Sequence, residues 1–170
     1  MTPSELLIEE FSRIQGYVGA TLKNATIATL TYRADADANT IAWLTWHLSR
    51  LQDDHIADLA GTEQVYTEQG WAERFDLPFE PKRIGYGFTS AEVADVRADA
   101  DLLGGYYDAV HTVTLAYLAS LSAADLDRVV DESWTPAVTV GVRLASVLSD
   151  DLQHAGQAAF VRGLADRAGV

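Results

Sequence analysis

The chain has 170 residues, of which 48% are hydrophobic and 22% charged, ordinary values for a globular protein that exclude disorder as the default. This length supports one compact domain with a core, so we expect a single domain over residues 1–170. The formal net charge of -13 would repel phosphate backbones and anionic lipid headgroups. We therefore expect neither nucleic acid nor a membrane as a partner.

Cysteine is absent, which excludes disulfides, thiolate metal ligands and a cysteine nucleophile. Any metal ion would therefore be bound through nitrogen and oxygen atoms. The sequence has no apolar run of the length that a membrane span needs, and its first residues lack the basic start and apolar stretch of a signal peptide. These features favour a cytoplasmic protein.

The spacing of apolar side chains predicts a first long helix over residues 4–23, with Ser4 as its N-cap. A second long helix is predicted from about residue 39, after a polar stretch. Gly61 is expected to end this helix, because glycine is the usual residue just past a helix C-terminus.

Residues 62–89 are rich in aromatic side chains and are predicted to form a long irregular connection. Loops of this length in a compact domain are usually functional or cover something. We expect either a lid or substrate wall, or a loop packed over the helices by ordinary aromatic burial. A third helix is predicted over residues 90–121, where the Gly104-Gly105 pair would kink it or admit a close neighbour.

Residues 122–126 are predicted to form a short capped turn, and residues 129–136 an extended segment. A fourth long helix is predicted over residues 139–167. No internal repeat is visible, which argues against a solenoid. Four long helices in one domain of this size predict an all-α four-helix bundle, with the aromatic-rich connection between its second and third helices.

The fourth helix carries acids and a histidine in an otherwise apolar segment. Asp150 and His154 are four residues apart, so they lie on the same helix face and could bind one ion together. The pattern places Asp151 inside the apolar stripe, and Asp150 and His154 along its edge. A buried acid beside an imidazole needs a partner, which a divalent metal ion would supply. A solvated helix face is the alternative.

Bundles build metal sites from side chains on several helices, so a further ligand is expected from another long helix. The second helix offers His47 and His55, and the third offers His111. His55 lies at the centre of its apolar stripe and His47 at the edge, so periodicity alone does not choose His47. Each of the three could instead be a core histidine whose ring bonds to a carbonyl.

Two short segments are similar to those of a known family. The Trp-His-Leu segment at residues 46–48 and the His-Ala-Gly-Gln segment at residues 154–157 resemble the DinB-like superfamily. Its members include mycothiol-dependent maleylpyruvate isomerases and bacillithiol or mycothiol S-transferases. The resemblance extends over residues 39–163, and it implies an up-down-down-up four-helix bundle and a homodimer.

The resemblance also implies one divalent metal ion bound by three side chains, which in this sequence are His47, Asp150 and His154. Many relatives carry histidine at the position of Asp150, while mycothiol-using relatives with an acid there are known. Zinc is the first expectation for the metal, with nickel, manganese and iron as alternatives.

Two histidines and one carboxylate leave coordination positions open, where a small thiol could be held as a nucleophilic thiolate. We therefore expect a metal-dependent S-transferase or isomerase that uses a small-molecule thiol, with mycothiol as the first candidate, and an electrophile. Four residues are expected to orient the ligands or accept the remaining imidazole proton: Asp54, His55, Asp151 and Gln157. The alternatives are a stress-associated metal-binding protein without catalysis, and a structural helical dimer without metal.

Overall fold

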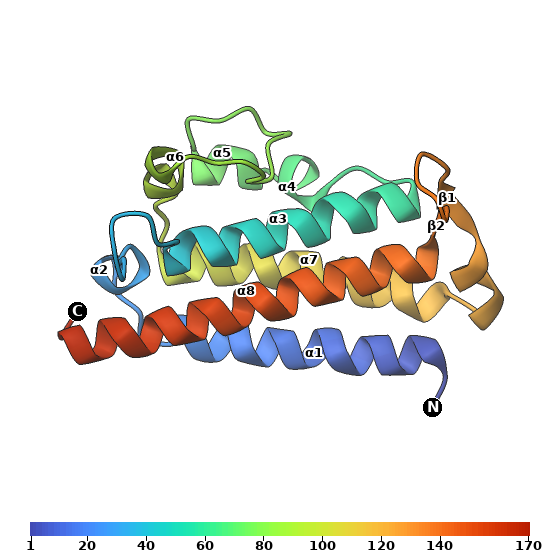
Figure 1. The fold of residues 1–170 in the computed structure, drawn as a ribbon, viewed down its shortest axis with the longest axis horizontal. Coiled ribbons are helices and arrows are strands. Elements are labelled where there is room, and N and C mark those ends of the chain that lie inside the picture. Colours follow the sequence, from blue (N-terminus) through green and yellow to red (C-terminus); the bar gives the residue numbers. More distant parts are fainter.

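Four long helices form the body of the computed structural model, which describes residues 1–170 (Figure 1). They are α1 (Pro3–Leu22), α3 (Ile41–Ala60), α7 (Ala100–Ser120) and α8 (Val140–Ala168). Figure 1 shows α1 and α8 running one way along the bundle and α3 and α7 the other way, which is the up-down-down-up order. α3 packs against α7 and α8, and α1 packs against the same two helices. The predicted all-α four-helix bundle is confirmed.

Capping residues set the ends of the first two long helices. Thr2, and not the predicted Ser4, is the N-cap of α1, because its hydroxyl accepts from the Glu5 N–H while the Glu5 carboxylate accepts from the Thr2 N–H. Ser4 is instead buried, and its hydroxyl donates to the carbonyl of Leu121 just after α7. Gly61 ends α3 in the left-handed conformation, as predicted.

The predicted third helix is wrong in one respect, because the structure divides it in two. α6 (Ser90–Asp95) is separate from α7. Asp99 caps α7 by accepting a hydrogen bond from the Leu102 N–H, which starts a new helix at this point. Val96 is extended and fully buried between the two helices, so the break is part of the core packing.

The connection between α3 and α7 contains two short helices that the apolar pattern did not predict, α4 (Val65–Glu68) and α5 (Trp71–Phe75). The expected irregular structure is therefore found mainly in its second half. Trp71 packs on Gly105 of α7, where a Cβ would lie 3.0 Å from the indole Cη2 atom. α7 continues through this point, so the glycine pair admits a close neighbour and does not interrupt the helix.

Smaller elements complete the chain. α2 (Ile27–Leu30), which was not predicted, precedes α3, and η1 (Ala123–Asp127) is the capped turn expected after α7. β1 (Val129–Asp131) pairs antiparallel with β2 (Val138–Thr139), so the extended segment predicted here is confirmed for β1. A cluster of 32 buried apolar residues forms the core between the long helices. No helix combines the length and the apolar character needed to cross a lipid bilayer.

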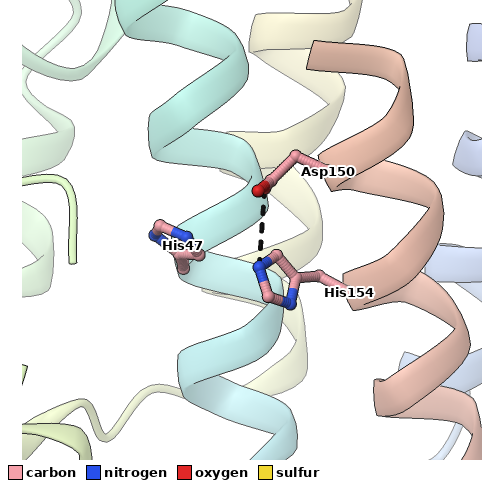
Figure 2. A group of neighbouring side chains, drawn as sticks. All are labelled: His47, Asp150 and His154. Carbon is pink, nitrogen blue, oxygen red and sulfur yellow. Dashed lines mark ion pairs between the residues drawn. The ribbon is translucent and has the colours of Figure 1, made fainter. Parts of the chain in front are cut away.

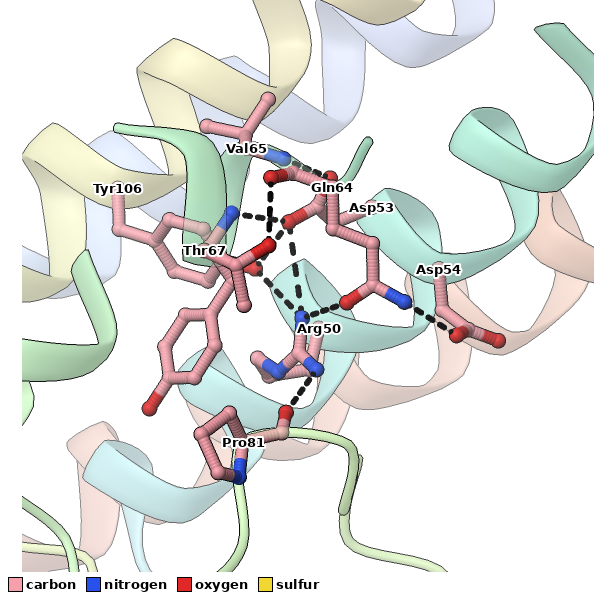
Figure 3. Close-up of polar contacts among 9 residues, drawn as sticks. Arg50, Asp53, Asp54, Gln64, Val65, Thr67, Pro81 and Tyr106 are labelled. Atoms are coloured by element: carbon pink, nitrogen blue, oxygen red, sulfur yellow. Dashed lines mark hydrogen bonds and ion pairs between the residues drawn. The ribbon is translucent and has the colours of Figure 1, made fainter. Parts of the chain in front are cut away.

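Arg50 of α3 is fully buried and holds the connection against the bundle (Figure 3). Its Nη2 atom donates to the Pro81 carbonyl at 2.7 Å, and its Nη1 atom donates to the side-chain oxygen of Gln64 at 2.8 Å. The guanidinium carbon lies 4.0 Å from the ring centroid of Tyr66. Burying a charge destabilises a fold unless the charge is paired and hydrogen-bonded. The contacts with Pro81, Gln64 and Tyr66 are therefore needed to keep Arg50 buried.

Asp53 supplies the opposite charge one turn later, with its Oδ2 atom 3.6 Å from Arg50 Nη1. It accepts hydrogen bonds at 2.8 Å from the N–H groups of Val65 and Tyr66 and from the hydroxyl of Tyr106. The two N–H groups belong to the first turn of α4, which has no side-chain cap of its own. The Arg50–Asp53 pair thus joins α3 to α4, to α7 and to the second half of the connection.

Arg50→Met should lower the free energy of unfolding by about 3 kcal/mol, because removing one member of a buried ion pair leaves the other charge uncompensated. Urea unfolding followed by circular dichroism measures the change. Arg13→Met is the matched control, since Arg13 pairs with Glu9 on the exposed face of α1 and its loss should change little. Equal stability of the two variants would contradict the role given to Arg50.

Candidate metal centre

Three side chains converge where α3 packs against α8 (Figure 2). His47 comes from α3, and Asp150 and His154 come from successive turns of α8. One possible ligand atom from each of the three lies within 4.8 Å of the others. The Oδ2 atom of Asp150 is 3.5 Å from the Nε2 atom of His154. We call these three residues the triad.

His47 is held by the backbone of the connection. It is buried, and its Nδ1 atom donates a hydrogen bond to the carbonyl of Ile84, which leaves Nε2 unprotonated and free to bind an ion. The ring of Trp43 stacks on His47 with the centroids 4.7 Å apart. Burial lowers the pKa of His47, so the neutral imidazole that a metal requires is favoured.

His154 is held in the same way from its own helix. Its Nδ1 atom lies 2.9 Å from the side-chain oxygen of Gln157, which can accept a hydrogen bond from it, while its Nε2 atom faces Asp150 Oδ2. The imidazole centroids of His47 and His154 are 4.9 Å apart. Gln157 thus makes the contact expected of a residue that orients a ligand.

Gly85 allows the connection to approach His47. A Cβ atom at this position would lie 2.6 Å from His47 Nδ1. The backbone has a φ of +107°, which residues other than glycine rarely adopt. The next residue, Tyr86, is exposed and lies edge-on to the His47 ring at 5.5 Å. The sequence indicated Tyr86 only as one of the aromatic side chains of the connection and gave no role to Gly85, although glycines flank Tyr86 on both sides.

The two halves of the connection pack differently. Its first half is packed by ordinary aromatic burial, with Tyr66, Trp71 and Phe75 in the core. Its second half reaches the triad through Ile84 and Tyr86. Only this second half is placed to form a wall beside the triad.

Two adjacent acids of α8 have different surroundings. Asp150 belongs to the triad, and its Oδ2 atom is buried without a hydrogen-bond partner. Asp151 is fully buried, neither of its oxygens has a hydrogen-bond partner, and burial followed by the charge of Asp150 raises its pKa. The apolar pattern correctly predicted a buried Asp151, while the spacing of four correctly predicted that Asp150 lies with His154. Asp151 makes no hydrogen bond to the triad.

Asp54 and His55, which were expected to orient the metal ligands, make their hydrogen bonds away from the triad. His55 Nδ1 accepts from Arg143 at 3.2 Å, and Asp54 accepts from Gln64 at 2.7 Å. Burial, and next the charge of Arg143, lower the pKa of His55. His111 of α7 is buried against Tyr107, with the ring centroids 6.0 Å apart. Of the three histidines considered as a third metal ligand, the structure brings His47 next to Asp150 and His154.

The donor set fits one divalent ion. Zn²⁺ bonded at about 2.1 Å in tetrahedral geometry spaces its ligand atoms by about 3.4 Å. Asp150 Oδ2 and His154 Nε2 are 3.5 Å apart, and the three ligand atoms, which lie within 4.8 Å of one another, would draw together around an ion. With Nδ1 of each ring bonded to an oxygen, both histidines offer Nε2 as a ligand atom, and the Asp150 oxygen without a hydrogen-bond partner completes the set. The side chains of Asp150 and His154 are partly exposed, so a small molecule could reach an ion bound here.

Comparison with known proteins supports this assignment of the fold. The family model described as DinB superfamily matches residues 10–158. A crystal structure described as the conserved protein of locus from Enterococcus faecalis is 31% identical, with a TM-score of 0.89, over 95% of this chain and 96% of that chain. No curated protein matches the chain. The chain belongs to the DinB superfamily.

Proposed function

We propose that this protein is a divalent-metal-dependent S-transferase or isomerase that uses a small-molecule thiol. The observation that carries the proposal is the triad, in which two imidazoles and one carboxylate meet on a partly exposed side of the bundle. Three protein ligands with open positions are typical of catalytic metal sites, whereas structural sites use four. The DinB superfamily includes metal-dependent enzymes, which supports the same reading.

The triad would hold the ion through His47, Asp150 and His154, with zinc as the first candidate and nickel, manganese and iron as alternatives. The bound cation would favour the deprotonated form of a thiol and so supply a nucleophile at neutral pH. The Ile84 carbonyl and Gln157 keep the two imidazoles in the required tautomer. The ring of Trp43 stacks on His47 and lies edge-on to His154, so it packs against both imidazoles.

Charge around the triad favours an uncharged thiol. Arg143 is the basic side chain on this part of α8, and it already lies near the carboxylates of Asp58, at 3.8 Å, and Asp131, at 3.6 Å. With Arg143 offset in this way, the nearest charges to Tyr86 and the triad include the carboxylates of Asp150 and Asp54, which would repel a thiol that carries carboxylates of its own. Mycothiol is a sugar-based thiol without a carboxylate, and we propose it as the co-substrate. A homodimer and a cytoplasmic location remain predictions.

Gly85→Ala should weaken Zn²⁺ binding by about 10- to 100-fold, because the new methyl group would displace the His47 ring and break its bond to the Ile84 carbonyl. Competition with a chromophoric chelator measures the affinity. Gly87→Ala is the control for an added methyl group at a positive-φ position of the same loop: its φ is +68°, and nothing lies within 4 Å of the added group. An equal effect of both substitutions would contradict a role for contact with His47.

Metal-loaded protein should accelerate the conjugation of mycothiol with monochlorobimane, a reaction in which sulfur attacks carbon, chloride leaves and the thiol proton goes to solvent. His154→Ala should reduce the rate at least 100-fold, since it removes a ligand, while the helical content is retained. Gln153→Ala, on the exposed side of the same helix, should keep the parent rate. Fluorescence of the product gives the rate, and bacillithiol and glutathione serve as comparison thiols.

Two results would separate the alternatives. Stoichiometric metal binding without turnover of any of the three thiols would favour the metal-binding protein without catalysis. Turnover that persists in His154→Ala would place the reaction outside the triad.

A further inference from the structure

A small apolar pocket continues the α3–α8 contact beyond the triad. It has a volume of about 270 Å³, and its walls include Leu44 of α3, Val161 and Leu164 of α8, and Ala38 of the segment before α3. We call it the seam pocket. Six of its eight lining residues are hydrophobic, so water bound there would find few hydrogen-bond partners.

The seam pocket begins one helical turn from the triad on both helices. Leu44 is three residues before His47, and Gln157, which also lines the pocket, is three residues after His154. Three residues advance a helix by about 4.5 Å and return to nearly the same face. Gln157 therefore has two contacts, one with His154 and one with the pocket. The pocket and the triad are neighbours along the α3–α8 contact, and the ring of Trp43, which packs on both imidazoles, lies beside them.

The volume indicates what the seam pocket would accept. An enclosed cavity of about 150 Å³ in another protein holds one benzene ring, so this larger pocket has room for a single aryl ring or a short branched alkyl group, part of which would face solvent beside the exposed Phe160. The hydroxyl groups of a sugar-based thiol would find few hydrogen-bond partners among its six hydrophobic lining residues. In the opposite direction along α3 and α8, the side chains Asp54, His55 and Arg143 offer polar contacts.

Another apolar groove, of about 440 Å³ between α1 and α8, is less suited to this role. On α8 it is lined by Leu152 and Gly156, two residues before and two after His154. Two residues rotate about 200° around a helix, so this groove lies on the flank of α8 away from the triad.

We propose that the seam pocket binds the aryl or short alkyl group of the electrophilic substrate, while the thiol lies on the polar side of the triad. The inference rests on the proposed function, because it assumes that the electrophile reacts at the triad. It adds the substrate class: an electrophile with one small apolar substituent next to the reacting carbon.

Toluene binding to the metal-free protein tests the pocket without any turnover. Methyl NMR shifts should be confined to Leu44, Val161 and Leu164 and their close neighbours. Ala38→Phe should weaken toluene binding at least tenfold, because the ring fills the space, and Ala34→Phe fills it from a second position. Ala36→Phe is the matched control, since Ala36 belongs to the same segment but does not line the pocket. No shifts at these methyl groups, or equal loss in the control, would overturn the proposal.

Two electrophiles then test the substrate class with metal-loaded protein and mycothiol. Benzyl chloride carries an aryl group and iodoacetamide does not; in both, the new carbon–sulfur bond forms as halide leaves and the thiol proton passes to solvent. Ala38→Phe should lower kcat/KM for benzyl chloride about tenfold and leave that for iodoacetamide unchanged. Equal effects on both would reject the pocket as a substrate site while leaving the proposed function intact. Toluene binding without any turnover would instead reject the function and retain the pocket as an apolar ligand site.

Discussion

The buried pair of Arg50 and Asp53 is the constraint on which the rest of this structure depends. Both residues lie on α3, the helix that carries His47, and their hydrogen bonds reach α4, α7 and the Pro81 carbonyl. Their charges can be buried only if the connection returns over α3 and supplies these partners. Pro81 is three residues before Ile84, whose carbonyl bonds to His47. The same pair that fixes the connection therefore helps to orient a candidate metal ligand.

Two adjacent acids of α8 face different surroundings because neighbouring residues of a helix point in different directions. Asp151 points into the bundle, where burial raises its pKa and favours the neutral form. Asp150 lies at the contact with α3, where its unpartnered oxygen is 3.5 Å from His154 Nε2. A cation placed at the triad would satisfy that oxygen and the two free imidazole nitrogens together. The packing of α3 on α8 brings these three atoms together, and the proposed chemistry depends on the ion that they would bind.

The sequence predicted the features that depend on local pattern. The four long helices, the end of α3 at Gly61 and the spacing of Asp150 and His154 all follow from helical periodicity and capping. The break before α7 was missed although Asp99, a good N-cap residue, was visible, because the apolar pattern continued through it. Arg50 and Gly85 were beyond prediction for another reason. An arginine on a helix is usually solvated, and the contact of Gly85 with His47 joins residues 38 positions apart, so only the folded chain reveals either role.

Elemental analysis of the purified, untagged protein beside His154→Ala tests whether the triad binds a metal ion. We expect close to one divalent metal ion per chain in the parent and its loss in the variant, with the helical content unchanged. The absence of metal in the parent, even after divalent ions are added and the excess is removed, would contradict this expectation. Equal metal content in the parent and the variant would contradict it as well, because the ion would then be bound outside the triad.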